Sequence, residues 1–302
     1  MTGHLRALVL GAAAGGGLPQ WNCGCANCVD ARAGNAGLVP QTQSSIAFTA
    51  DGSDWAVFNA SPDIRQQLLD NAALHPRSLR DTPIASISLT NGDIDHIAGL
   101  LVVREKQPFN VFATPEIISA ISANPVFNVL DRNLVAINEV SPGQSYQAAP
   151  GLTAELFAVP GKVPLYLEGD QVQTDLVGEQ TVGVKLTSGD KSAYYVPGCA
   201  LITPALAERL RGADLVFFDG TLFTDSEMID TGTGVKTGRR MGHMPVSGND
   251  GSLAAFASLD VARRVFVHIN NTNPMWRPDS PARREIEASG WQIAHDGMEV
   301  SI

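Results

Sequence analysis

The chain has 302 residues and a mass of 31.9 kDa; 44% of its residues are hydrophobic, 17% are charged, and the formal net charge is −10. Low charge with ordinary hydrophobicity excludes a disordered chain. The acidic excess argues against general nucleic-acid binding and against a polybasic membrane patch. No apolar run is long enough to span a bilayer, and the apolar stretch at residues 6–10 is too short for a secretory signal. We expect a compact cytoplasmic protein that binds neither nucleic acid nor membrane.

The first half of the chain alternates short apolar strands with helical stretches. Strands are expected at residues 5–10, 45–49, 55–59, 84–90 and 111–113, and helices at residues 63–71 and 95–104. A Gly-rich turn at residues 15–17 follows the first strand, and Asp51-Gly52 joins the second strand to the third. The strand at residues 84–90 shows little polar alternation, which is typical of a strand buried on both faces.

The second half repeats this style. Strands are expected at residues 153–159, 181–186, 192–196, 215–219 and 264–269, and helices at residues 201–211, 251–259 and 280–289. Residues 291–294 and 298–302 are predicted to form a closing hairpin, and residues 232–242 a mobile surface loop. The pattern predicts an α/β protein with mixed sheets covered by helices, built as one domain over residues 1–302.

Three of the four cysteines lie close together, as Cys23, Cys25 and Cys28. In a cytosolic chain such a cluster is more typical of a metal site than of a disulfide framework. The pattern packs three soft thiolates into one turn, which suits tetrahedral Zn2+. We therefore expect one structural zinc ion there. The remaining cysteine, Cys199, is expected to be a buried free thiol.

The segment Thr90-Asn91-Gly92-Asp93-Ile94-Asp95-His96 lies between a predicted buried strand and a predicted helix. Polar groups at the carboxyl end of a strand are where α/β folds place active sites. Either aspartate could simply cap the helix. Capping accounts for one acidic residue, but not for two aspartates, an asparagine and a histidine within six positions, so the segment indicates a site.

This segment resembles the Thr-His-x-His-x-Asp-His signature of the metallo-β-lactamase superfamily, whose first two histidines hold one metal and whose Asp-His pair holds a second. Asn91 and Asp93 stand where those two histidines would be, whereas Asp95 and His96 are kept. Further along, Lys162 stands at the position of a third histidine and Pro197 at the position of a bridging aspartate. The last histidine of the signature is present as His268.

The resemblance therefore implies that the first metal site is lost and that Asp95, His96 and His268 keep the second, with Asp93 able to join them. Two histidines and one carboxylate are the ligand set of mononuclear non-haem Fe2+ oxygenases, which leave open positions for O2 and substrate. On its own, His268 reads better as an ordinary histidine at the end of a core strand. In register with Asp95 and His96, it is interpreted as a ligand.

Two further groups of residues are candidates for catalysis and binding. Asp219 and His243 resemble the acid–histidine pair that assists proton transfer in the tRNA-maturation and phosphodiesterase branches of the superfamily; a structural hydrogen bond or a helix cap explains them equally well. Arg239 and Arg240, with Lys236, lie just before His243. They are either solvated or clamp a substrate carboxylate.

Four segments together resemble the family that acts in synthesis of the cofactor pyrroloquinoline quinone (PQQ): residues 15–25, 59–63, 90–96 and 296–299. The resemblance covers essentially the whole chain and implies a four-layered αββα sandwich and a homodimer with the cysteine site near its contact. In related phosphodiesterases a histidine three positions beyond the last active-site histidine completes the zinc site; here that position is Asn271. The fourth zinc ligand would then have to be the side-chain oxygen of Asn271, a water molecule or a group from a partner.

The resemblance also implies an activity, namely Fe2+-dependent hydroxylation of the tyrosine ring in a Glu–Tyr unit cut from a precursor peptide, with the other enzymes of the PQQ pathway as partners. Two alternatives remain open. One, also implied by the resemblance, is a soluble carrier that moves PQQ or its precursor towards the periplasm. The other is a zinc-dependent hydrolase, which the missing half of the dinuclear cage makes a poorer match.

Overall fold

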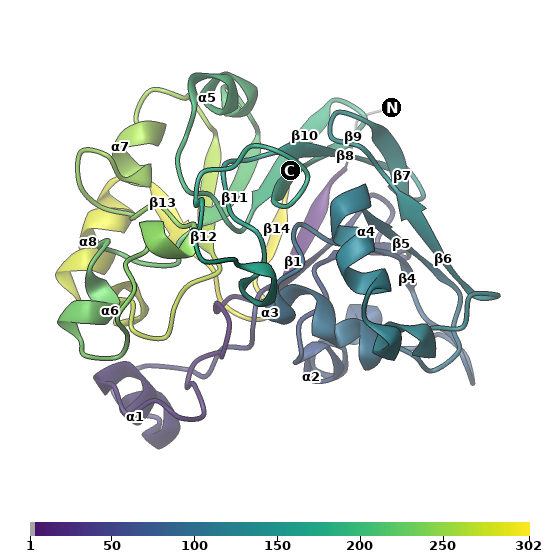
Figure 1. Cartoon of the computed structure of the whole chain (residues 1–302), viewed down its shortest axis with the longest axis horizontal. Coiled ribbons are helices and arrows are strands. Elements are labelled where there is room, and N and C mark those ends of the chain that lie inside the picture. The colour runs from purple at the N-terminus through teal and green to yellow at the C-terminus, as the bar shows by residue number, and fades with distance from the viewer. Residues whose placement is uncertain (1–3) are drawn as a thin grey trace.

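The computed structural model describes residues 4–302 and consists of two β-sheets packed face to face, with helices on both outer sides (Figure 1). The predicted four-layered sandwich is therefore confirmed. Each sheet has seven strands. Each also combines antiparallel pairs at one end with parallel pairs at the other.

The first sheet takes most of its strands from the first half of the chain. Its order is β14 (Glu299–Ser301), β1 (Arg6–Gly11), β2 (Ser45–Thr49), β3 (Trp55–Phe58), β4 (Ile84–Ser88), β5 (Phe109–Ala113) and β6 (Val135–Glu139). The strands from β3 to β6 are parallel to one another. Their carboxyl ends therefore meet at one edge, where the segment around Asp95 begins.

The second sheet is built in the same way from the second half. Its order is β13 (Trp291–Ile293), β12 (Arg263–Val267), β11 (Leu215–Asp219), β10 (Lys191–Val196), β9 (Val182–Ser188), β8 (Leu152–Ala158) and β7 (Ser145–Ala149). The strands from β10 to β13 are parallel. β11 therefore delivers Asp219 and β12 delivers His268 to the same edge.

Eight α-helices and several 3-10 turns connect the described strands. The α-helices are α1 (Ala26–Ala33), α2 (Ile64–Asp70), α3 (Ile94–Ile97), α4 (Pro115–Ser122), α5 (Pro204–Leu210), α6 (Glu227–Asp230), α7 (Ser252–Phe256) and α8 (Pro281–Ala288). The 3-10 turns are η1 (Ala72–Leu74), η2 (Ala98–Leu101), η3 (Pro125–Val129), η4 (Leu165–Leu167), η5 (Arg239–Met241) and η6 (Pro274–Trp276). Apolar residues of α2, α3 and α4 join one core cluster on the outer face of the first sheet.

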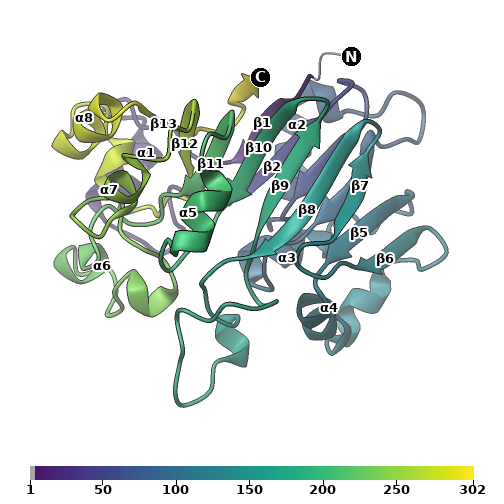
Figure 2. The ribbon, with the colours of Figure 1, turned by 90° about the horizontal axis from the view of Figure 1, so that it is seen from above.

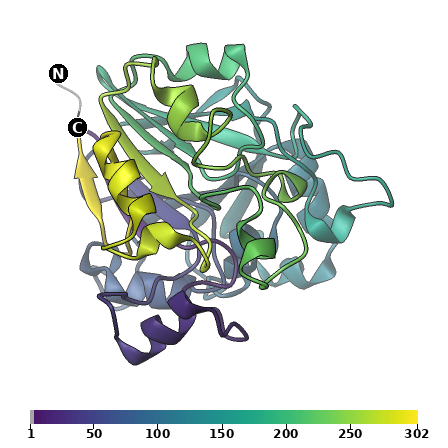
Figure 3. The same cartoon turned by 90° about the vertical axis from the view of Figure 1, so that its left-hand side faces the viewer.

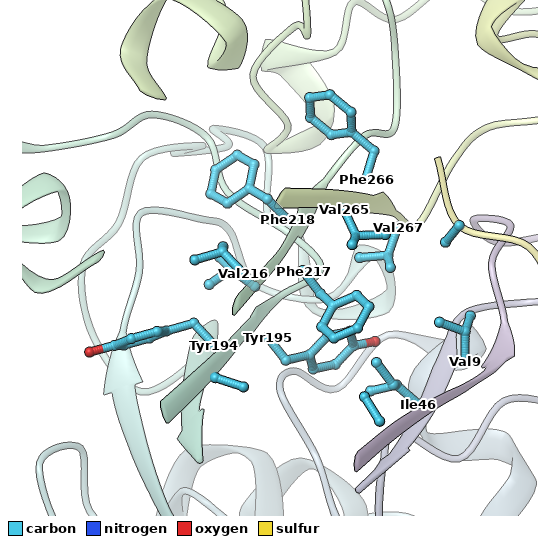
Figure 4. Close-up of a cluster of buried hydrophobic side chains, with 14 of the residues drawn as sticks. Val9, Ile46, Tyr194, Tyr195, Val216, Phe217, Phe218, Val265, Phe266 and Val267 are labelled. Atoms are coloured by element: carbon cyan, nitrogen blue, oxygen red, sulfur yellow. The ribbon is translucent and has the colours of Figure 1, made fainter. Parts of the chain in front are cut away.

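The main core lies between the two sheets and is rich in aromatic rings. Phe48 of β2 meets Phe217 of β11 edge to face, with ring centroids 5.9 Å apart. Figure 4 shows Tyr195 and Phe217 turned towards the first sheet, while Phe218 points the other way, where it packs on Phe256 of α7. Because β11 is buried on both faces, its length and direction are strongly fixed, and so is the position of Asp219 at its end.

The predicted closing hairpin is wrong. β13 pairs with β12 in the second sheet, whereas β14 pairs with β1 in the first. Figure 3 shows the C-terminal strand, in yellow, at the outer edge of the molecule. The chain crosses between the sheets at Asp296, whose carboxylate accepts hydrogen bonds from the backbone N–H groups of Ala12 and Thr42. These long-range bonds outweigh the local turn signal at Asp296-Gly297.

Several predicted boundaries also move, and some elements were not predicted. The helix expected at residues 95–104 is instead a short α3 followed by η2. The helix expected at residues 201–211 starts at Pro204, because Thr203 caps it and proline suits the first helical position. Strands β6 and β7 and helix α4 were not predicted. Within residues 4–302, no helix has the length and apolar character needed to cross a bilayer.

Candidate metal centre

The carboxyl ends of β4 and β12 bring three predicted ligands together. Oδ2 of Asp95 lies 3.3 Å from Nε2 of His268 and 3.7 Å from Nε2 of His96. One ligand atom from each residue lies within 4.8 Å of the other two, which is the spacing that a shared metal ion requires. Nε2 of His96 is buried and has no hydrogen-bond partner. A buried nitrogen with a free lone pair, beside a carboxylate and a second imidazole, fits a divalent metal ion.

Asn91 fixes the orientation of His96. The backbone N–H of Asp93 donates to Oδ1 of Asn91 at 3.0 Å, so this atom is the amide oxygen. Nδ1 of His96 lies 2.7 Å from the same oxygen and must therefore carry the ring hydrogen. Nε2 is left as a bare acceptor directed at the site. Asn91 thus replaces a lost ligand with the kind of supporting hydrogen bond that metal-binding histidines usually have.

Thr221 fixes the orientation of His268, and it also contacts the predicted acid–base pair. Its hydroxyl lies 2.6 Å from Oδ1 of Asp219, 2.8 Å from Nδ1 of His268 and 3.0 Å from the carbonyl oxygen of His268. The one hydroxyl hydrogen is used on an oxygen, so Nδ1 of His268 donates, and Nε2, which lies 3.3 Å from Oδ2 of Asp95, is the nitrogen that a metal ion could take over. No sequence pattern singled out Thr221, since a threonine after a strand carries no signal of its own.

Asp219 and His243 form the predicted contact. Oδ2 of Asp219 accepts a hydrogen bond from Nδ1 of His243 at 2.7 Å, and also one from the backbone N–H of Cys199 at 2.9 Å. The ring of His243 stacks on that of His268, with centroids 5.1 Å apart. Asp219, His243 and His268 also satisfy the spacing of a metal-binding group. His268 therefore belongs to both groups and links the acid–base pair to the candidate metal.

The charges of these carboxylates and imidazoles favour a bound cation. Burial works against ionisation of Asp95 and Asp219, but the neighbouring histidines outweigh it and hold the pKa of both carboxyls below the usual range. Burial lowers the pKa of His96 to about 4, so this imidazole is neutral at neutral pH. Burial also works against charging of His268, yet the hydrogen bond to Asp95 and the nearby carboxylates raise its pKa. A proton on His268 is then the local substitute for a metal cation.

Two small structural features hold Asp95 and the end of β4 in place. An added Cβ at Gly15 would lie 3.3 Å from the carboxyl of Asp95, so the Gly-rich turn lies directly against that ligand. Asn59 has a left-handed backbone (φ 65°), and its side chain bonds both the N–H and the hydroxyl of Thr90, which holds the end of β4. A tight turn was predicted at residues 15–17, but its contact with Asp95 was not.

The other predicted site residues lie farther from the ligand atoms or face other partners. Asp93 belongs to neither metal-binding group, and burial together with Asp95 raises its pKa. Lys162 pairs with Glu168, with Nζ 3.0 Å from Oε1. Arg240 contacts the same carboxylate at 3.2 Å, whereas Arg239 pairs with the exposed Asp250 at 2.6 Å.

The cysteine cluster forms a separate group at the start of α1. The sulfur atoms of Cys23, Cys25 and Cys28 lie within 4.8 Å of one another. Nδ2 of the Asn271 side-chain amide lies 3.2, 3.6 and 3.3 Å from the sulfurs of Cys23, Cys25 and Cys28. Those distances match the edges of a tetrahedral zinc site, because Zn–S bonds of about 2.3 Å and Zn–O bonds of about 2.0–2.2 Å separate the ligand atoms by roughly 3.5 Å. With its oxygen turned inward, Asn271 fits as the fourth ligand.

The segment after β12 joins the two groups. It carries His268 at one end and Asn271 three residues later, and the amide of Asn27 in α1 donates to the carbonyl oxygens of Asn271 and Asn273. Cys199 takes no part in the cluster. It is a fully buried free thiol, as predicted, and burial raises its pKa beyond the ordinary range.

Comparisons with known proteins agree with this geometry. The family model described as "Beta-lactamase superfamily domain" matches residues 54–269. Coenzyme PQQ synthesis protein B of Rhizobium meliloti (strain 1021) is 59% identical over 100% of this chain and 99% of its own length. That of Ruegeria pomeroyi is 57% identical over 98% and 99%. The crystal structure of Zn2+-bound PqqB from Methylobacterium extorquens superposes with a TM-score of 0.96 at 49% identity, over 98% of this chain and 99% of that one. The predicted metallo-β-lactamase fold is thereby confirmed.

Proposed function

The chain belongs to the family of coenzyme PQQ synthesis protein B, and on that premise we propose that it hydroxylates the tyrosine ring of a Glu–Tyr precursor of PQQ in an Fe2+- and O2-dependent reaction. The observation that carries the proposal is the buried, unpartnered Nε2 of His96 beside Asp95 and His268. Two imidazoles and one carboxylate hold Fe2+ while leaving coordination positions for O2 and substrate.

The site residues have distinct roles in this proposal. Asp95, His96 and His268 would hold the metal, with Asp93 close enough in sequence to join when a metal is bound. When bound, Fe2+ would supply the activation of O2 that no amino-acid side chain provides. In the overall reaction a ring C–H becomes C–OH, the second oxygen atom leaves as water, and two electrons come from an external reductant.

Asp219 and His243 would manage protons during this reaction. The ionised Asp219 accepts Nδ1–H of His243 and so leaves Nε2 of His243 as an acceptor. From that position His243 can take the phenolic proton of a bound tyrosine as a general base. Asp219 orients the imidazole and stabilises its charged form, as a buried carboxylate does in other acid–base pairs.

The cysteine cluster serves structure in this proposal. One Zn2+ would be held by Cys23, Cys25 and Cys28 with Asn271, and would fix α1 against the segment that follows His268. The related PqqB of known structure is a Zn2+-bound protein. We further propose that the protein is cytoplasmic and forms a homodimer with the cysteine site near the contact.

The proposal is tested by loading the purified protein anaerobically with Fe2+, then adding Glu–Tyr, a reductant and O2. Uptake of O2 coupled to loss of the tyrosine is expected. Matched samples loaded with Zn2+ should consume neither. Absence of O2 uptake combined with tight binding of PQQ would instead favour the soluble carrier, and cleavage of a precursor peptide by the Zn2+ form would favour the hydrolase.

A further inference from the structure

The segment of residues 159–181 between β8 and β9 projects from the body of the molecule beyond the ends of those strands (Figure 2). It contains the 3-10 turn η4, whose residues Leu165, Tyr166 and Leu167 are 62%, 42% and 50% exposed. Large apolar side chains at the surface mark sites of contact with a ligand or partner. The hydroxyl of Tyr166 donates to the carbonyl oxygen of Gly92, so this segment lies against the loop that carries Asp93 and Asp95.

Glu168, directly after η4, connects this segment to two cations. Its carboxylate oxygens lie 3.0 Å from Nζ of Lys162 and 3.2 Å from Nη2 of Arg240. The side chains of Glu168 and Lys162 are only 8% and 12% exposed. Burial works against ionisation of Glu168, but the two cations outweigh it and lower its pKa. The carboxylate is therefore ionised and shared between Lys162 and Arg240.

Lys162 lies against the backbone next to His243. A Cβ added to Gly242 would lie 3.2 Å from Cγ of Lys162, and Gly242 directly precedes His243. The hydroxyl of Thr181, whose backbone pairs with that of Asn91, donates to the carbonyl oxygen of Lys162. Nη1 of Arg240 is buried and has no hydrogen-bond partner. Two cations therefore share one carboxylate, and Nη1 of Arg240 still lacks an acceptor, so this pair can bind an anion more fully than it binds Glu168.

We propose that Lys162 and Arg240 form the subsite for a carboxylate of the substrate, and that Glu168 occupies this subsite when no substrate is bound. The identity of that substrate as a Glu–Tyr unit rests on the proposed function. An entering carboxylate replaces Glu168 on the same two cations, so the exchange conserves charge. Release of Glu168 frees the segment, whose exposed apolar residues then cover the bound tyrosine ring. Lys162, at the position of a lost metal ligand, becomes a specificity residue.

The test is calorimetric titration of the full-length protein with the dipeptide Glu–Tyr under anaerobic conditions, where no turnover occurs. Glu168→Gln removes the internal competitor and should tighten binding by about threefold to tenfold. Lys162→Met should weaken it by about tenfold or more, as expected for loss of a charge-assisted hydrogen bond. Glu155→Gln and Lys191→Met are the matched controls, because they break the peripheral ion pairs Glu155–Arg209 and Lys191–Asp214. They should leave binding unchanged.

Unchanged or weaker binding by Glu168→Gln would overturn the proposal. The tighter binding that we expect of this variant cannot arise from misfolding. Gln–Tyr lacks the glutamate carboxylate, and the C-terminal amide of Glu–Tyr lacks the C-terminal carboxylate. The ligand whose affinity no longer falls in Lys162→Met is the one that lacks the carboxylate held in the subsite. The outcome is separable from the proposed chemistry. If the affinities change as expected but no O2-dependent hydroxylation occurs, the subsite is supported and the hydroxylase is rejected. If hydroxylation occurs with an unaltered KM in Lys162→Met, the hydroxylase is supported and the subsite is rejected.

Discussion

Oδ2 of Asp95 lies 3.3 Å from Nε2 of His268, although 173 positions of sequence separate the two residues. Asp95 follows a strand of the first sheet and His268 follows a strand of the second. His268 takes a left-handed backbone conformation (φ 55°) as it leaves β12, and its ring contacts those of His96 and His243. A metal ion held by both residues would therefore tie the two halves of the sandwich together at one edge.

Asn91→Leu should weaken metal binding at this centre by about 10- to 100-fold, because it removes the hydrogen bond that holds Nδ1 of His96 and frees the ring to rotate. The measurement is a competition titration with a chromophoric chelator. The cysteine-bound zinc should keep its affinity in the same sample. Asn124→Leu, on an exposed helix end, is the control, and equal metal affinity in both variants would contradict the role given to Asn91.

Thr221→Val should also weaken this metal, since His268 and Asp219 lose a shared hydroxyl. The buried Asp219 would keep fewer donors, which costs about 1–3 kcal/mol in the free energy of unfolding. Thr221→Ser restores the hydroxyl and should return both the metal affinity and the urea-unfolding midpoint to nearly the original values. If serine rescues neither quantity, the effect of valine lies in packing rather than in the hydrogen bonds.

Cys25→Ser should lower zinc content and thermal stability together. The three sulfurs and Asn271 connect α1 to the segment behind His268, so loss of zinc should loosen that connection. Cys199→Ser is the matched control, because Cys199 is buried but lies outside the cluster. Elemental analysis should give about one zinc fewer per chain for Cys25→Ser only. A full zinc content in Cys25→Ser would rule out the cysteine site.

Glu227 gives a pH dependence of stability that does not involve the metal centre. Burial raises the pKa of Glu227 to about 7, even though its carboxylate accepts hydrogen bonds from Thr272 and from the N–H of Phe223. Because the folded-state pKa lies above the unfolded value, the stabilisation is present at low pH and is lost as the pH rises towards 7. The loss is about 3 kcal/mol in the free energy of unfolding.

Urea unfolding of the original chain and of Glu227→Gln at several pH values measures this effect. The difference between the two should grow in favour of glutamine from about pH 4.5 to about pH 7 and then level off. Other titrating groups are common to both chains and cancel. A difference that stays constant over this range would show that Glu227 titrates normally.

The candidate metal-binding group could be predicted from the sequence because a short signature contains Asp95 and His96 and a strand end contains His268. The supporting residues could not. Thr221 contacts the side chain of Asp219, two positions earlier, and those of His243 and His268 from distant segments. Asn91 looked only like a replaced ligand. Both roles depend on the orientation of imidazole rings, which residue types alone do not reveal.

The fold shows the same division. Strands with continuous apolar runs, such as β4 and β11, were predicted close to their observed bounds. The pairing of β13 and β14 was wrong, because two short strands with a turn between them look like a hairpin until Asp296 is seen to bond Ala12 and Thr42. Such contacts span most of the chain and leave no local pattern. The prediction of one domain over residues 1–302 stays a prediction.

The most direct test of the central claim is the mass of the product formed by the Fe2+-loaded protein from Glu–Tyr and a reductant under 18O-labelled O2. The account predicts that the tyrosine ring gains one oxygen atom, that this atom carries the label, and that His96→Ala combined with His268→Ala abolishes its incorporation. A product without labelled oxygen, or full incorporation in the double variant, would contradict a hydroxylase built on Asp95, His96 and His268.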